Sequence, residues 1–81
     1  MRRAAVIRAI KMAAKAHELF FTEHAVQAML DDDENEESVS NAIAHASSFT
    51  CQPDGTWRVH GDGLTAIVAM RPGVIVVTIF V

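Results

Sequence analysis

Two side chains that could act together on a phosphodiester stand two positions apart in the second half of the chain. Arg58 and His60 flank Val59 in a stretch where apolar and polar residues alternate. Alternate residues of a β-strand point to the same face, so Arg58 and His60 are predicted to lie together. RNA cleavage needs a cation beside the scissile phosphate and a group that moves a proton, which an arginine and a histidine supply. An ordinary solvent-facing strand presents the same pattern and is the alternative interpretation.

The other histidines stand at predicted helix ends. His24 opens a helix, where either a functional side chain or a partly buried, hydrogen-bonded one fits the position. His17 and His45 close helices, where a cationic imidazole favours the negative end of the helix dipole. His17 and His45 are therefore interpreted as structural.

Charge is distributed unevenly along the chain, whose formal net charge is −3. Five of the seven basic residues lie in the first fifteen positions, and six of the ten acidic residues lie in the segment 31–37. Arg8, Lys11 and Lys15 share one side of the first predicted helix, where they are candidate contacts to RNA phosphates or simply a solvated face. The acidic segment lacks the glycine and the ligand spacing of an EF-hand loop, so no calcium site is predicted.

Neither a metal site nor a cofactor is predicted. Cys51 is the single cysteine, and no Cys/His set has the spacing of zinc ligands. No helix follows the glycine-containing turn at 61–63, so this turn is not a phosphate-binding loop. One unpaired cysteine is typical of a cytoplasmic protein, and the longest apolar stretch, 74–81, is too short to cross a membrane.

Apolar periodicity predicts a single α+β domain over residues 1–81, with helices first and a four-stranded antiparallel sheet after them. Helices are predicted over residues 2–17, 23–30 and 36–46, with a junction or short strand at 18–22. Strands are predicted over residues 48–52, 56–60, 64–70 and 74–81, joined by short turns that contain glycine.

The same patterns predict which side chains the core buries. Trp57 and Val59 are expected to face the helices, with Arg58 and His60 on the opposite face. Apolar stripes are expected at Val6, Ile10 and Ala13 in the first helix and at Val26, Met29 and Leu30 in the second. The last strand is apolar on both faces, with Val74, Val76 and Phe80 predicted on one and Ile75, Val77, Ile79 and Val81 on the other. Because short helices can cover only one sheet face well, a second copy or a protein partner is expected on the other.

The run Phe21-Thr22-Glu23-His24-Ala25-Val26-Gln27-Ala28-Met29-Leu30 resembles the "F-T-x-H-A-x-x-R-M" opening of a family of small bacterial proteins akin to the MqsR and RelE toxins. The similarity continues in the segments 36–43, 57–65 and 74–79, so it spans about residues 19–81 and leaves 1–17 as an added N-terminal helix. This resemblance implies a RelE-like fold, with helices on one face of an antiparallel sheet. It also implies metal-independent cleavage of mRNA on the open sheet face and an antitoxin-like protein partner. By similarity, His24 corresponds to the motif histidine and joins Arg58 and His60 as a catalytic candidate.

Two functions remain open on these residues. The resemblance favours a toxin-type endoribonuclease that binds RNA. However, Ala28 stands where the motif has arginine, Asp32 and Asp33 replace its Arg-Gly pair, and the chain contains no tyrosine. These departures remove groups that such nucleases use, and they favour the alternative of an inactive RelE-like domain that binds a protein partner.

Overall fold

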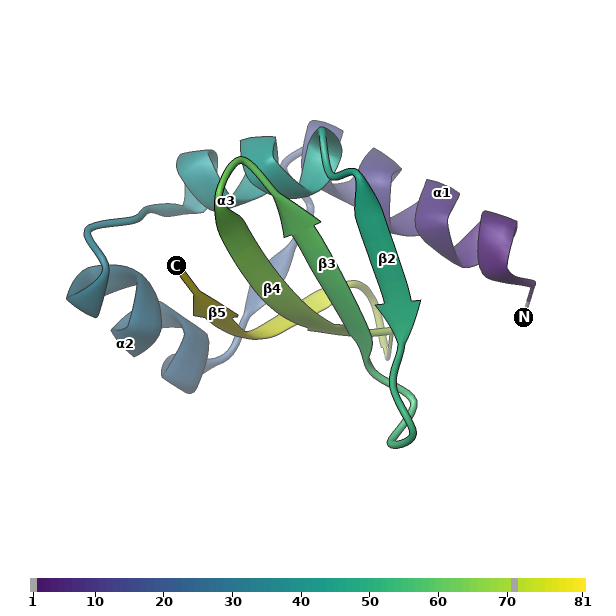
Figure 1. Ribbon diagram of the computed structural model, residues 1–81. Coiled ribbons are helices and arrows are strands. Elements are labelled where there is room, and N and C mark those ends of the chain that lie inside the picture. Colours follow the sequence, from purple (N-terminus) through teal and green to yellow (C-terminus); the bar gives the residue numbers. More distant parts are fainter. Residues whose placement is uncertain (1, 71) are drawn as a thin grey trace.

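The computed structural model describes residues 2–70 and 72–81, which form three α-helices and one five-stranded mixed sheet (Figure 1). The helices are α1 (Arg3–Lys15), α2 (Glu23–Asp31) and α3 (Glu36–Ala44). The strands are β1 (Phe20–Phe21), β2 (Ser48–Cys51), β3 (Trp57–Gly61), β4 (Leu64–Ala69) and β5 (Ile75–Phe80). The predicted α+β class, with the helical part ahead of the antiparallel strands, is confirmed.

The strands lie in the order β1-β5-β4-β3-β2. Strands β2 to β5 form the predicted antiparallel meander. The prediction of four antiparallel strands is nevertheless wrong, because β1 adds to the sheet parallel to β5. Hydrogen bonds from Phe20 N to Val74 O (2.9 Å) and from Thr22 N to Val76 O (3.1 Å) hold this two-residue strand. A strand of two residues is too short to show an alternation of apolar and polar residues in the sequence.

Side-chain caps fix where α2 and α3 begin. Thr22 Oγ1 accepts a hydrogen bond from Ala25 N at 3.0 Å and donates one to Val77 O at 2.6 Å, so the start of α2 is tied to β5. At α3, Asn35 and Ser38 form a reciprocal capping box. The first of these caps sets the position of His24.

One face of the sheet is covered by α1 and α3, which contact each other (Figure 1). Val6 and Ile10 of α1 are buried, so the first helix is docked as predicted. The third buried position of α1 is Ala14, and the predicted Ala13 packs only partly against the core.

The apolar stripe predicted for α2 is wrong except at Met29. Ala25 and Met29 are buried, whereas Val26 and Leu30 remain 42% and 69% exposed. Ala25 and Met29 are four positions apart, so they share one side of the helix. That side of α2 packs on β5.

A β-bulge in β5 overturns the predicted facing of the last strand. Val76 is paired with Val68 and Thr78 with Ile67, so Val77 is an extra residue. The alternation inverts there: Val76 and Ile79 are both buried, and Phe80 is 51% exposed. The prediction that Phe80 shares a face with Val76 is therefore wrong.

Gly61 allows α3 to lie directly on the sheet. A Cβ atom added at Gly61 would stand 2.5 Å from Ala42 O and 2.8 Å from Ala46 Cα. Both neighbours are backbone atoms, which cannot move aside as a flexible side chain can. This position of β3 therefore tolerates no side chain.

We expect Gly61→Ala to lower the free energy of unfolding by about 1–3 kcal/mol, because the added methyl group overpacks the contact with α3. Gly63→Asn is the matched control, since nothing lies within 4 Å of its added Cβ and asparagine tolerates its φ of +72°. Urea unfolding followed by circular dichroism measures both variants. Equal losses of stability in the two variants would contradict the close approach of α3.

The turn between β2 and β3 contains a titratable group. Asp54 Oδ1 accepts hydrogen bonds from Thr56 Oγ1 (2.6 Å) and Thr56 N (2.9 Å), and these lower the pKa of the Asp54 carboxyl from its ordinary value of 3.8. A depressed folded-state pKa stabilises the fold above the unfolded-state value, and that contribution is lost as the pH falls through the folded-state value.

We expect Thr56→Val to raise the pKa of Asp54, because it removes the side-chain hydrogen bond, the larger cause of the shift. Thr56→Ser keeps a hydroxyl group and is expected to keep the low value. Titration of the Asp54 carboxyl carbon by NMR in the two variants checks this. An unchanged midpoint in Thr56→Val would show that the side-chain bond has no influence.

Candidate functional site on the exposed sheet face

Strand β3 separates the core from the candidate catalytic pair. Along β3, Trp57 and Val59 are buried, whereas Arg58 and His60, which alternate with them, are exposed. The predicted orientation of all four side chains is therefore confirmed. Arg58 and His60 lie on the sheet face away from α1 and α3.

The pairing of β3 with β2 and β4 shows which residues are next to Arg58 and His60 on this face. Arg58 lies between Thr50 of β2 and Ile67 of β4. His60 lies between Ser48 of β2 and Thr65 of β4. We refer to Thr50, Arg58, His60 and Thr65 as the sheet-face cluster.

A hydrogen bond fixes the imidazole of His60. Its Nδ1 lies 2.9 Å from Oγ1 of the buried Thr65. With Nδ1 engaged, Nε2 is the ring nitrogen that remains to exchange a proton with a bound ligand. Thr65 was not among the predicted site residues, although the turn residues Asp62 and Gly63 indicate its position. A two-residue turn, here with φ of 52° and 72°, pairs the residues on either side and places His60 opposite Thr65.

His24 does not reach this cluster. It lines a hollow of about 290 Å³ between α2 and the end of β5, together with Asp31, Thr78 and Phe80. Phe80 is opposite Thr65, so β4 and β5 both stand between His24 and His60. Two strand spacings alone amount to roughly 10 Å. The three catalytic candidates are thus divided between two places.

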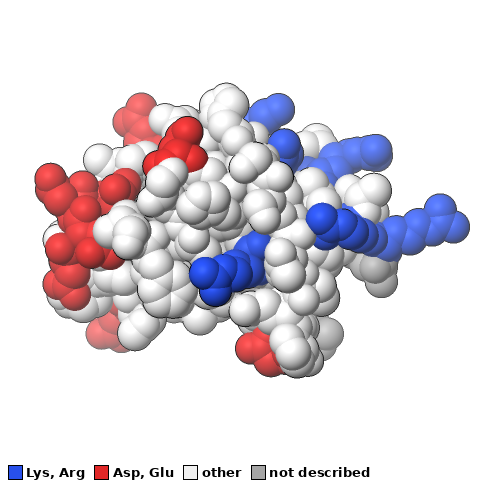
Figure 2. Space-filling view, viewed as in Figure 1, with Lys and Arg blue, Asp and Glu red and all other residues white. Residues whose placement is uncertain are grey.

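The basic residues of α1 also lie apart from the cluster. Lys11 Nζ is 5.7 Å from the centre of the Phe49 ring, and the Arg3 guanidinium is 5.8 Å from that of Trp57. Phe49 and Trp57 are buried on the core face, so α1 lies across the sheet from Arg58. Figure 2 shows most of the visible Lys and Arg at the α1 end of the molecule and most of the visible Asp and Glu at the opposite end.

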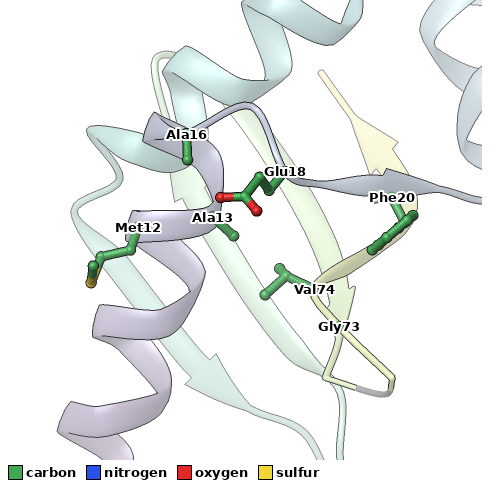
Figure 3. A pocket seen from close by; sticks show the side chains of 7 residues that line it. All are labelled: Met12, Ala13, Ala16, Glu18, Phe20, Gly73 and Val74. Carbon is green, nitrogen blue, oxygen red and sulfur yellow. The ribbon is translucent and has the colours of Figure 1, made fainter.

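Two larger hollows lie apart from the cluster. The one in Figure 3, of about 380 Å³, lies between the end of α1 and the segment leading into β5; Met12, Phe20 and Val74 line it, and Glu18 extends into it. A larger one, of about 580 Å³, lies at the β2–β3 turn. Neither joins a histidine to an arginine, so the sheet-face cluster remains the candidate site for phosphodiester chemistry.

Within residues 2–70 and 72–81, no group of three or more His, Cys, Asp or Glu side chains is arranged to hold a metal ion. In the same part of the chain, no helix is long and apolar enough to cross a membrane. Comparisons of the chain with protein-family models, curated proteins and solved structures found no match.

We expect substitutions of exposed residues in the sheet-face cluster to leave the stability of the fold nearly unchanged. Arg58→Ala and His60→Ala should each change the free energy of unfolding by less than about 1 kcal/mol, because both side chains are exposed. Trp57→Ala should cost about 3–5 kcal/mol, because its ring is buried against α1. Chemical unfolding of the three variants tests this, and a large loss in His60→Ala would assign His60 a structural role.

Proposed function

We propose that this chain is a RelE-like, toxin-type domain of a cytoplasmic bacterial system that cleaves mRNA on its exposed sheet face without a metal ion. The pairing of exposed Arg58 and His60 on β3, with His60 Nδ1 held by Thr65, carries the proposal. The resemblance of residues 19–81 to the MqsR and RelE toxins supplies the class of reaction.

In this proposal the reaction is an internal phosphoryl transfer. His60 Nε2 takes the proton of a ribose 2′-hydroxyl, whose oxygen attacks the adjacent phosphorus. The bond from phosphorus to the 5′-oxygen breaks, and that oxygen takes up a proton from water. The products are a 2′,3′-cyclic phosphate and a 5′-hydroxyl, and no redox step is involved. Arg58 stabilises the charge that develops on the phosphoryl oxygens.

Residues outside the cluster then bind neighbouring nucleotides. Phe80, half exposed beside Thr65, offers a ring on which a base can stack. His24 lies beyond Phe80 and contacts a second nucleotide of the same RNA in this proposal, rather than the scissile phosphate. Arg8, Lys11 and Lys15 would bind RNA only where it passes around the edge of the sheet.

The test is cleavage of a single-stranded RNA in the presence of EDTA by the full chain. We expect His60→Gln to slow cleavage by about 10²–10⁴-fold, through loss of proton transfer. Arg58→Ala should slow it by about 10²–10³-fold, through loss of charge stabilisation. His45→Gln is the matched control, because His45 is exposed on the end of α3 and bonds Asn41 O.

A substrate with a 2′-deoxyribose at the scissile position should remain intact in the same assay. Folded wild-type protein that leaves every RNA uncut, or equal rates in His60→Gln and His45→Gln, would contradict the ribonuclease proposal.

The second candidate is an inactive RelE-like domain that binds a protein partner. Its specific support is the apolar part of the exposed sheet face, where Phe80 is 51% exposed and Ile67 is half-buried. A partner that covers these side chains removes apolar surface from water. Absence of cleavage by the folded wild-type protein would favour this candidate.

A further inference from the structure

We propose that the outer edge of β2 binds an extended acidic segment of a partner protein, which joins the sheet as an additional strand. This inference does not depend on the ribonuclease proposal. It begins with the backbone of β2. In the part of the chain that the structure describes, β2 pairs with β3 alone.

Register shows which backbone groups point outward from β2. Gln52 N donates to Thr56 O at 2.8 Å, so these two residues are a hydrogen-bonded pair. Bonded and non-bonded pairs alternate along an antiparallel ladder, which makes Thr50 and Arg58 the next bonded pair. Phe49 and Cys51 therefore turn their N–H and C=O groups away from β3. These groups can pair with an incoming strand.

The edge carries no charge, proline or bulge that would block such pairing. The strand Ser48–Cys51 contains no charged residue and no proline, and its pairing with β3 runs without a register shift. Edge strands are commonly protected by charges, prolines or bulges. An uncharged, regular edge of four residues is therefore suited to strand addition.

Positive charge stands on both sides of this edge. On the core side, Lys11 stacks over Phe49, and the exposed Arg8 and Lys15 lie on the same side of α1. On the other side, the exposed Arg58 is next to Thr50. Side chains of an added strand would point alternately to these two sides. Acidic residues on both faces of the incoming strand match this arrangement.

A second copy of the chain fits this edge less well. Pairing β2 with β2 around a two-fold axis would bring the two basic sides of α1 towards each other, which like charges oppose. The chain's own acidic residues 31–37 lie at the opposite end of the molecule, in and between α2 and α3 (Figure 2). RNA could bind the cations, but it cannot form a β-ladder with Phe49 and Cys51.

The probe is a fluorescein-labelled peptide of sequence Glu-Glu-Thr-Val-Glu-Glu-Thr-Val, which has acidic side chains on both faces of a strand. Fluorescence anisotropy with the full chain measures its binding. We expect affinity to fall as NaCl rises from about 50 to about 500 mM, because the charges are exposed. A peptide with lysine in place of glutamate should bind at least about ten-fold more weakly. N-methylation of alternate peptide bonds, which removes the donors of one strand edge, should also weaken binding at least about ten-fold.

Hydrogen exchange then locates the contact. The amides of Phe49 and Cys51 should gain about ten-fold protection when the acidic peptide is present, and the amide of Thr50, already bonded to β3, should change little. Arg8→Ala combined with Lys15→Ala should weaken peptide binding about ten-fold. Leu30→Glu combined with Asn41→Glu alters the net charge by the same amount at exposed positions of α2 and α3, and it should not.

Binding without new protection at Phe49 and Cys51, or binding that survives N-methylation, would overturn strand addition. Protection of these amides that grows with protein concentration in the absence of peptide would instead assign the edge to a second copy. If RNA displaces the peptide and leaves both amides unprotected, the basic side chains bind RNA and strand addition is overturned. None of these readouts uses RNA cleavage, so failure of the ribonuclease proposal leaves this test intact.

Discussion

The contact of α3 with the backbone of β3 determines which face of the sheet is available to a ligand. At Gly61 there is no room for a side chain, because Ala42 of α3 and Ala46, just after α3, occupy the space that a Cβ would need. That contact places Gly61 on the core side. Alternation along the strand then leaves Arg58 and His60 on the exposed side. A register slip of one residue would bury both polar side chains beneath α3, so the candidate site depends on this close packing.

Much of the sheet and half of the site could be predicted from local pattern. In residues 57–60 every apolar side chain alternates with a polar one, so the sequence itself distinguishes the two faces. The turn at Asp62 and Gly63 also determines, through its two-residue length, that His60 is paired with Thr65. These features are local, and each depends on residues fewer than six positions apart.

The features that could not be predicted are those that distant residues decide. The last strand is apolar on both faces, so nothing in it marks the bulge at Val77 that turns Phe80 outward. A junction or short strand was predicted at 18–22, but not its parallel pairing with β5, in which Phe20 and Thr22 donate to carbonyl groups more than fifty residues away. The packing of α2 on β5 likewise buries Ala25 and Met29 and leaves Val26 and Leu30 exposed. His24 follows α2 to the far edge of the sheet, away from the histidine that it was predicted to join.

The two proposed surfaces meet at Arg58. On the exposed face, its guanidinium is the cation of the sheet-face cluster. From the edge, it is the charge beside Thr50 that an added acidic strand would engage. A carboxylate paired with Arg58 would neutralise the charge that a scissile phosphate needs. An acidic strand on β2 would therefore oppose RNA cleavage through direct competition for one side chain, with no change in the fold of the sheet.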